Sequence, residues 1–264
     1  MIKVENVSFS QKGKYLLSDI NFQISSGKFH AIIGPNGAGK STLIKLLAGS
    51  LHPTEGKIWM NGRELSTYSI SALAGMRAVL SQYYPILMPI KTEELILLGK
   101  SDRFEALNSK YDRIKMLGLL EEMKITHLYN RYYHSLSGGE AQLVQLCRVL
   151  LQLEREDISA NNKFLFLDEP VSHLDIQYQH AVLAVATSLV SKGITVVSVL
   201  HDINLALDYA SNIHMMKMGK LIRSTSEEQP LIPEDIRQVY GLDASLVDTG
   251  RAHQYMIRIH PPLK

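Results

Sequence analysis

The chain is poor in the features that mark secreted, membrane-spanning and nucleic-acid-binding proteins. Its 264 residues include a single cysteine, so no disulfide can form within the chain. No apolar stretch approaches the roughly 18 residues that a membrane-spanning helix needs, and the amino-terminus lacks a signal-peptide core. The net charge is +2 without a lysine or arginine run, which disfavours nucleic acid as a partner. These absences favour a protein of the reducing cytoplasm.

What is present is an alternation of strand and helix patterns, which predicts an α/β protein. Apolar alternation and continuous apolar runs predict strands at residues 2–9, 20–24, 29–33, 57–60, 78–80, 164–167 and 195–200. The continuous runs are typical of buried parallel strands, whereas the first two segments predict an antiparallel hairpin. Leucine-rich helical periods dominate from about residue 83 to 150, which predicts an α-helical insertion into a β-α-β core. Helices are also expected at 175–191 and 233–240, before a tail of strand-like alternation.

A phosphate-binding loop is the first motif that carries chemistry. The pattern G-x-x-x-x-G-K-[ST] is matched after a strand and before a helix by Gly34, Pro35, Asn36, Gly37, Ala38, Gly39, Lys40 and Ser41, with Thr42 following. Glycines let backbone amides turn toward phosphate oxygens, and the helix start adds a favourable dipole. We expect Lys40 to reach the β and γ phosphates and the Ser41 hydroxyl to ligate Mg²⁺.

Two carboxylates follow a hydrophobic strand in the second half of the chain. The run from residue 164 to 167 ends in Asp168 and Glu169. One carboxylate at such a place can hold Mg²⁺ through its water shell, while its neighbour polarises the attacking water. We therefore assign the metal role to Asp168 and the general-base role to Glu169.

Two further polar residues stand at strand ends. Gln82 follows the strand at 78–80 and can touch Mg²⁺ or the attacking water through its amide, although a lone glutamine carries no meaning. His201 follows the strand at 195–200, where an imidazole can hydrogen-bond a γ-phosphate. An isolated histidine is more often structural, and its place at a strand end favours the catalytic interpretation here.

A second glycine-rich motif, LSGGE at residues 136–140, lies between the phosphate loop and the acidic pair. Ser137, Gly138 and Gly139 would open a helix with unpaired backbone amides, which is a second place where an anion can bind. The chain is therefore expected to carry two half-sites for phosphate.

Together these motifs resemble the nucleotide-binding subunits of ATP-binding-cassette (ABC) transporters, over essentially residues 1–225. The motifs follow that family's order along the chain: the Walker A loop, the Q-loop glutamine, the LSGGE signature, the Walker B strand, the D-loop at 172–175 and the switch histidine His201. The resemblance implies a P-loop NTPase core with an antiparallel β subdomain and an inserted α-helical subdomain. It divides a single domain over 1–264 into a core at 1–82 and 151–225, a helical subdomain at 83–150 and a C-terminal extension at 226–264.

The resemblance also implies partners and cofactors. Two copies would pair head to tail in the presence of ATP and Mg²⁺, so that the signature of one covers the γ-phosphate on the Walker A loop of the other. The homodimer would lie on the cytoplasmic face of the inner or plasma membrane, bound to permease subunits around residues 83–89. A periplasmic or surface substrate-binding protein would act with it indirectly.

The cargo is narrowed by similarity in further segments. Residues 174–179, 199–206 and 209–210 are similar to the importer branch that serves haem, ferric siderophores and cobalamin. Within that branch, residues 77–82 and 144–150 are most similar to haem importer ATPases. A siderophore or cobalamin importer, a soluble ABC ATPase of iron-sulfur cluster assembly and a non-hydrolysing nucleotide sensor are the alternatives. Soluble repair ATPases usually carry long coiled-coil inserts, for which the helical insert is too short.

Two positions depart from the family pattern. The aromatic residue that stacks on adenine falls near Gln11, which has no aromatic face. Tyr15 or Phe9 could substitute, and a core position is an equal alternative for Tyr15. His173 occupies the D-loop where a small residue is common, and either altered communication across the dimer or a harmless surface change would fit.

Overall fold

A six-stranded sheet runs through the middle of the molecule. The computed structural model describes residues 1–81, 86, 88–100, 109–154, 158–226, 228–248, 250 and 255–260. The strand order is β10-β9-β3-β8-β7-β6, with all neighbours parallel except the antiparallel pair β9 and β10. The strands are β3 (Phe29–Ile33), β6 (Arg77–Leu80), β7 (Phe164–Asp168), β8 (Thr195–Val199), β9 (Asn212–Lys217) and β10 (Lys220–Ser224). Parallel pairing brings the carboxyl ends of β3, β6, β7 and β8 to one edge.

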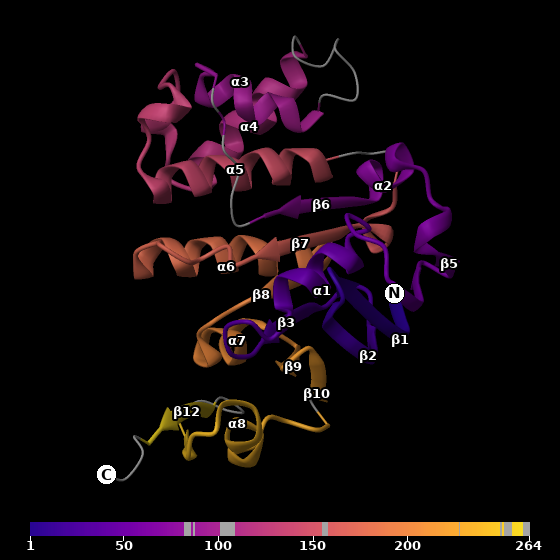
Figure 1. Cartoon of the computed structure of the whole chain (residues 1–264). Coiled ribbons are helices and arrows are strands. Elements are labelled where there is room, and N and C mark those ends of the chain that lie inside the picture. The colour runs from indigo at the N-terminus through magenta and orange to yellow at the C-terminus, as the bar shows by residue number, and fades with distance from the viewer. Residues whose placement is uncertain are drawn as a thin grey trace.

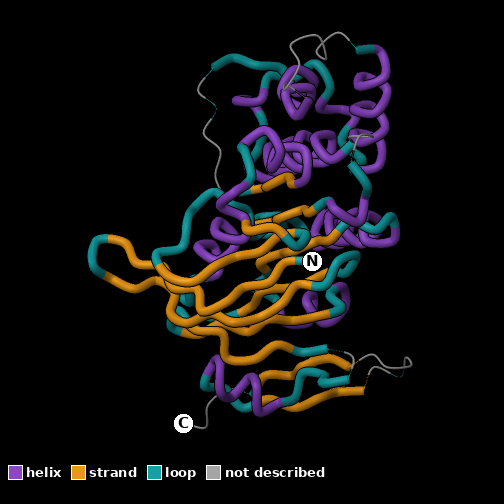
Figure 2. Tube along the Cα trace, turned by 90° about the vertical axis from the view of Figure 1, so that its right-hand side faces the viewer, coloured by secondary structure: helices purple, strands orange, loops and turns teal. Residues whose placement is uncertain are grey.

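Two antiparallel sheets complete the β structure. One has the order β2-β1-β4-β5, from β1 (Ile2–Gln11), β2 (Lys14–Ile24), β4 (Glu55–Met60) and β5 (Arg63–Glu64). The other is the hairpin of β11 (Ala244–Asp248) and β12 (Tyr255–Ile259) near the carboxyl terminus. Figure 2 shows the two larger sheets between the helices at one end of the molecule and this hairpin at the other.

Helices lie at both ends of the molecule and beside the central sheet. Helices α3 (Thr92–Leu97), α4 (Lys110–Glu122) and α5 (Gly138–Leu153) gather at one end, and α8 (Pro233–Tyr240) lies with β12 at the opposite end (Figure 1). The others are α1 (Lys40–Leu47), α2 (Ile70–Met76), α6 (Ile176–Ser191) and α7 (Ile203–Tyr209). Among the described residues no helix has both the length and the apolar character needed to span a membrane.

Two hydrophobic cores lie on opposite faces of the central sheet. Because side chains alternate along a strand, Phe164 and Phe166 of β7 join the core beneath α1 and the antiparallel sheet. Leu165 and Leu167 join the larger core that includes the helices α3 to α6. Burial on both faces explains why β7 is apolar at consecutive positions and stops where the carboxylates begin.

The predicted α/β cassette fold is confirmed, with local differences. All predicted strands are present, and the helix at 233–240 has the bounds expected. The sequence patterns did not predict α2, α7, β9 or β10. Strand β9 has the sequence NIHMMK and contains no alternation; its strand conformation depends on pairing with β3, since strand propensity varies with context.

A buried histidine pair joins β9 to β3. His30 Nδ1 lies 3.0 Å from His214 Nε2, His30 Nε2 lies 3.0 Å from the Ser25 carbonyl oxygen, and His214 Nδ1 lies 2.8 Å from Ser224 Oγ. Burial lowers the pKa of His30 to about 4 and that of His214 to about 3. Both rings are therefore neutral in the folded protein near pH 7.

We expect this pair to make the fold acid-sensitive. The unfolded chain binds protons at these histidines below about pH 6.5, whereas the folded chain does not until about pH 4, so acidification favours unfolding within that window. At pH 5 each histidine then costs on the order of 2 kcal/mol of unfolding free energy relative to pH 7.5. Guanidinium denaturation of His30→Gln should show a smaller loss between these pH values than wild type. His52→Gln, at an exposed position, is the control and should match wild type; equal losses in all three proteins would contradict the assignment.

Candidate functional site

The phosphate loop connects the end of β3 to the start of α1, and its backbone requires glycine. Gly34 has φ 150°, and a Cβ there would lie 2.2 Å from the carbonyl oxygen of Met216. Gly39 has φ 96°, and a Cβ there would lie 2.7 Å from a methyl of Leu17. Neighbouring strands therefore approach the loop too closely for any side chain at either position. The result is a bare backbone turn whose amides can approach a phosphate group.

Lys40 folds back over this loop. Its Nζ donates to the carbonyl oxygens of Gly34 at 2.7 Å and Pro35 at 3.0 Å, and the residue is 5% exposed. Burial lowers the pKa of the Lys40 ammonium, and the nearby carboxylates of Glu169 and Asp168 oppose that shift. A phosphate in the loop would supply the negative charge that a buried ammonium needs.

Ser41 and Asp168 meet although they are far apart in sequence. The Ser41 hydroxyl donates to Asp168 Oδ1 at 3.0 Å. Asp168 is 4% exposed, and burial raises the pKa of its carboxyl group. Two hard oxygen ligands beside a phosphate loop fit Mg²⁺, which takes few protein ligands and completes its shell with phosphates and water. Among the described residues no cluster of three or more His, Cys, Asp or Glu could hold a metal.

Glu169 and His201 form the polar pair at the ends of β7 and β8. His201 Nε2 lies 2.7 Å from Glu169 Oε1. The Glu169 side chain is 15% exposed and that of His201 is 44% exposed, so the carboxylate is shielded while the imidazole faces solvent. The Glu169 backbone has φ 54°, a left-handed conformation that is unfavourable for a residue with a Cβ.

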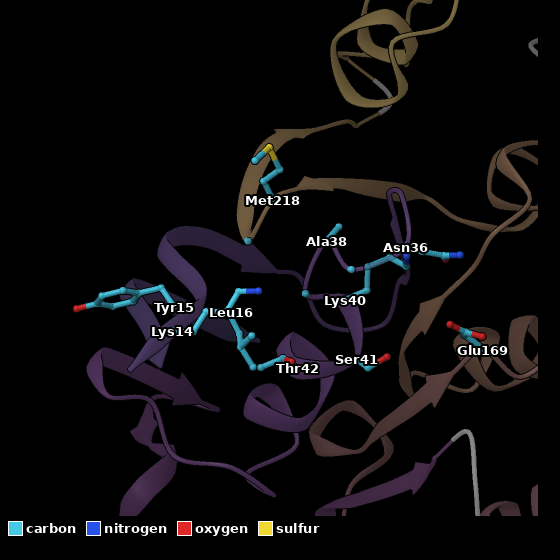
Figure 3. Close-up of a pocket in the computed structure, with 13 residues that line it drawn as sticks. Lys14, Tyr15, Leu16, Asn36, Ala38, Lys40, Ser41, Thr42, Glu169 and Met218 are labelled. Atoms are coloured by element: carbon cyan, nitrogen blue, oxygen red, sulfur yellow. The ribbon is translucent and has the colours of Figure 1, made fainter. Parts of the chain in front are cut away.

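A pocket of about 560 Å³ lies over the phosphate loop. It is lined by Lys14, Tyr15, Leu16, Asn36, Gly37, Ala38, Gly39, Lys40, Ser41, Thr42, Glu169, Met218 and Gly219. Figure 3 shows Tyr15 and Glu169 at opposite ends of the pocket, with Lys40 between them. Tyr15 is 57% exposed and its hydroxyl donates to Glu55 Oε1 at 3.0 Å. A core position for Tyr15, the alternative that its sequence position left open, is therefore wrong. Phe9 instead packs against a hydrophobic core.

We expect the Tyr15 ring to contact the nucleotide base. Stacking of a base on an aromatic ring contributes about 1–3 kcal/mol, so Tyr15→Ala should weaken ATP binding by roughly tenfold or more. Tyr15→Phe keeps the ring and loses only the hydrogen bond to Glu55, and should bind like wild type. Titration of a fluorescent ATP analogue measures both affinities. An unchanged affinity in Tyr15→Ala would place the base elsewhere.

The signature motif starts α5 and faces a second pocket. Ser137 is the N-cap: its Oγ accepts from the Glu140 amide at 3.3 Å, and its own amide donates to Glu140 Oε2 at 2.8 Å. This capping box orders the first turn. Ser137, Gly138 and Gly139 line a pocket of about 660 Å³ that includes no residue of the phosphate loop. The structure therefore keeps the two predicted phosphate half-sites apart within one chain.

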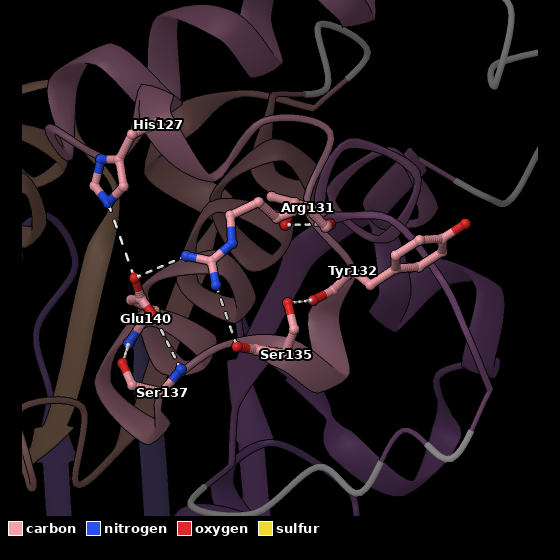
Figure 4. A network of polar contacts seen from close by, with 7 residues as sticks. His127, Arg131, Tyr132, Ser135, Ser137 and Glu140 are labelled. Carbon is pink, nitrogen blue, oxygen red and sulfur yellow. Dashed lines mark hydrogen bonds and ion pairs between the residues drawn. The ribbon is translucent and has the colours of Figure 1, made fainter.

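The Arg131 guanidinium and the His127 ring lie beside the Glu140 carboxylate. Arg131 Nη1 lies 3.5 Å and His127 Nε2 lies 3.9 Å from Glu140 Oε1 (Figure 4). Hydrogen bonds from Ser137 are the main reason that the pKa of Glu140 is lowered. The ionised carboxylate is thus turned toward Arg131 and the cap, and an anion at the start of α5 would be bound by the other backbone amides of the first turn.

Sequence reasoning placed most of these residues and missed others. Gln82 lies outside the described residues. His173 is exposed with φ 69° and lines the second pocket. Residues that the motifs did not identify include Met218 in the first pocket and Gln142, whose Nε2 donates to the Glu169 carbonyl oxygen at 3.1 Å. No signal in the sequence marks Gln142, since a polar residue on an amphipathic helix usually faces solvent.

Known proteins share both the sequence pattern and the fold. The family model for ABC transporters matches residues 17–172. The hemin import ATP-binding protein HmuV of Gloeobacter violaceus is 38% identical over 242 residues, covering 92% of this chain and 88% of that protein. An inward-facing metal-chelate type ABC transporter matches with a TM-score of 0.78 and 25% identity, covering 100% of this chain and 98% of that chain. A bacterial ABC transporter cassette solved as a dimer gives 0.75 and 26%, covering 86% and 98%.

Proposed function

Because this chain belongs to the ATP-hydrolysing subunits of ABC transporters, we propose that it drives a membrane permease that imports haem. The observation that supports this cargo is the 38% identity to a hemin import ATP-binding protein over 92% of the chain. The whole-length likeness to a metal-chelate type transporter agrees with it. Ferric-siderophore and cobalamin import, and a soluble role in iron-sulfur cluster assembly, are the competing functions.

The residues of the first pocket take separate parts in ATP hydrolysis. The phosphate loop holds the β and γ phosphates through its backbone amides and Lys40. When bound beside Ser41 and Asp168, Mg²⁺ would neutralise charge on the phosphates. Glu169 lies at the phosphate end of the pocket, where its carboxylate takes a proton from the attacking water. His201 holds that carboxylate through the 2.7 Å contact and can bind the γ-phosphate, and we assign Gln82 to the water or the cation.

The second pocket supports pairing of two copies. Ser137 to Gly139 line a different pocket from the phosphate loop, so we assign them to the ATP of a partner copy and not to that of their own chain. A second copy placed head to tail would bring its α5 start to the γ-phosphate, and two-fold symmetry then completes both sites. The ABC cassette solved as a dimer supports pairing of two copies for a chain of the same fold.

The permease would bind this homodimer at the cytoplasmic face of the inner or plasma membrane. Its contact is proposed at residues 83–89, of which 86, 88 and 89 are described; Met88 is 65% exposed. A substrate-binding protein outside the membrane would deliver the cargo. The predicted division into core, helical subdomain and C-terminal extension stays part of the proposal.

Uptake by a deletion strain tests the cargo. A strain without this chain should fail to grow on haem as its iron source, while growth on ferric siderophores and cobalamin uptake remain normal. A plasmid with the wild-type chain should restore growth on haem, and one with Lys40→Ala should not. Loss of siderophore or cobalamin uptake instead would identify one of the related cargoes, and normal uptake of all three would favour the soluble alternative.

A further inference from the structure

The backbone of Glu169 is held in an unfavourable conformation by its surroundings. Its φ of 54° lies in the left-handed region, which a residue with a side chain adopts only when neighbouring contacts impose it. Glu169 follows the last residue of β7 directly, so this conformation decides the direction in which its carboxylate leaves the sheet. Whatever stabilises the backbone here also sets the position of the carboxylate.

The Glu169 carbonyl oxygen accepts hydrogen bonds from two directions. Within the same loop, Ser172 donates from Oγ at 2.9 Å and from its amide at 3.3 Å. From α5, Gln142 Nε2 donates at 3.1 Å. Of the two donor residues, Gln142 is the one that comes from the helical end of the molecule. Its contact is partly buried and spans 27 positions of sequence.

Gln142 lies one helical turn beyond Gly138 of the signature. Residues four apart share a face of an α-helix, so Gly138 at the start of α5 and Gln142 lie one above the other. The same turn packs on the D-loop, since a Cβ on Gly139 would lie 3.3 Å from a methyl of Leu174. A shift of the signature turn would therefore move Gln142 and, through its hydrogen bond, the carbonyl oxygen of Glu169.

We propose that Gln142 is a positioning residue that couples the signature turn of this chain to its general base. In the head-to-tail pair on which this inference rests, the signature turn binds the γ-phosphate of the ATP held by the partner. The same chain's Glu169 acts on its own ATP. Gln142 thus makes the geometry of the base at one site depend on nucleotide at the other, and the two sites hydrolyse ATP cooperatively.

Replacement of the Gln142 amide by a carboxylate isolates this contact. A glutamate side chain keeps the shape of glutamine but presents an acceptor to the Glu169 carbonyl oxygen, so that a hydrogen bond becomes a repulsion. Because a misplacement of the order of 1 Å can cost about 10²-fold in rate, we expect Gln142→Glu to lower kcat by roughly 10- to 100-fold. Gln142→Met removes the donor without adding charge and should lower kcat less.

A glutamine on the same helix provides a matched control. Gln152 also donates its amide to backbone carbonyl oxygens, those of Ala74 at 3.0 Å and Arg77 at 3.1 Å, and it lines neither pocket. Gln152→Glu should lower the unfolding midpoint while leaving kcat close to wild type. A general loss of stability at α5 is therefore separated from a loss of positioning.

Phosphate release by the full-length chain across ATP concentrations tests the proposal. Gln142→Glu should reduce kcat and flatten the cooperative dependence on ATP, while the monomer's nucleotide affinity stays within about twofold of wild type. A kcat equal to that of Gln152→Glu, or a fall in affinity as large as the fall in kcat, would overturn it. The assay contains no cargo, so failed haem uptake with the Gln142 effect intact would refute only the proposed cargo.

Discussion

Glu169→Gln should lower the ATP turnover number by a factor of about 10² to 10⁴, the usual contribution of a general base. Glutamine keeps the shape of glutamate, so its carbonyl oxygen can still accept from His201 Nε2 across the 2.7 Å contact. It cannot take a proton from the attacking water. Nucleotide affinity should stay near wild type, because the phosphate loop and Lys40 are unchanged. Steady-state phosphate release and a nucleotide titration measure the two effects separately.

The control for this change is a glutamate outside the site. Glu64 forms a surface ion pair with Lys57 at 3.0 Å, and Glu64→Gln should retain wild-type turnover because exposed pairs contribute little. If Glu169→Gln turned over ATP at a rate near that of Glu64→Gln, Glu169 would not be the base. His201 would then become the first candidate for that role.

Ser137→Arg should abolish the ATP-dependent dimer and reduce turnover by about two orders of magnitude or more, since removal of one donor from an anion-stabilising site costs about 10²–10³ in rate. The change removes the capping box with Glu140 and places a cation at the positive end of α5. It also fills the second pocket with a long side chain. Monomeric ATP affinity should not change, because Ser137 lines no part of the first pocket.

Dimer formation is best measured where hydrolysis is slow. In a Glu169→Gln background, ATP should convert the chain to a dimer on size-exclusion chromatography, and the added Ser137→Arg should leave it monomeric. Ser109 caps α4 in the same way, with its Oγ accepting from the Asp112 amide at 3.3 Å. Ser109→Arg is therefore a matched control that should still dimerise. Persistence of the dimer in Ser137→Arg would argue against the composite site.

The local parts of the site could be predicted because short-range chemistry defines them. A glycine-rich turn between a strand and a helix exposes amides in any fold, and Gly34 and Gly39 show that neighbouring backbone excludes a side chain there. The helix start predicted at Ser137 to Gly139 is confirmed, and a capping box between Ser137 and Glu140 forms within its first turn. The apolar run of β7 likewise fixes where Asp168 and Glu169 emerge.

Contacts between distant segments could not be predicted. Tyr15 looks like a strand residue in sequence, and only the packing of β2 beside the phosphate loop makes it an exposed wall of the pocket. His214 lies in a strand without alternation, and its burial is tolerable because His30 and Ser224 satisfy its ring nitrogens. Gln142 gains a role only when α5 is laid against the loop after β7.

The sequence by itself determined the phosphate loop, the carboxylate pair and the signature turn, because each depends on residues within a few positions of one another. The order of these motifs along the chain indicated the family. Only the tertiary structure decided how these parts are related. The order of the parallel strands brings Ser41 to Asp168 and Glu169 to His201, and it leaves Ser137 to Gly139 facing a different pocket. Strand order and helix packing arise from long-range burial of apolar surface, which local patterns do not encode.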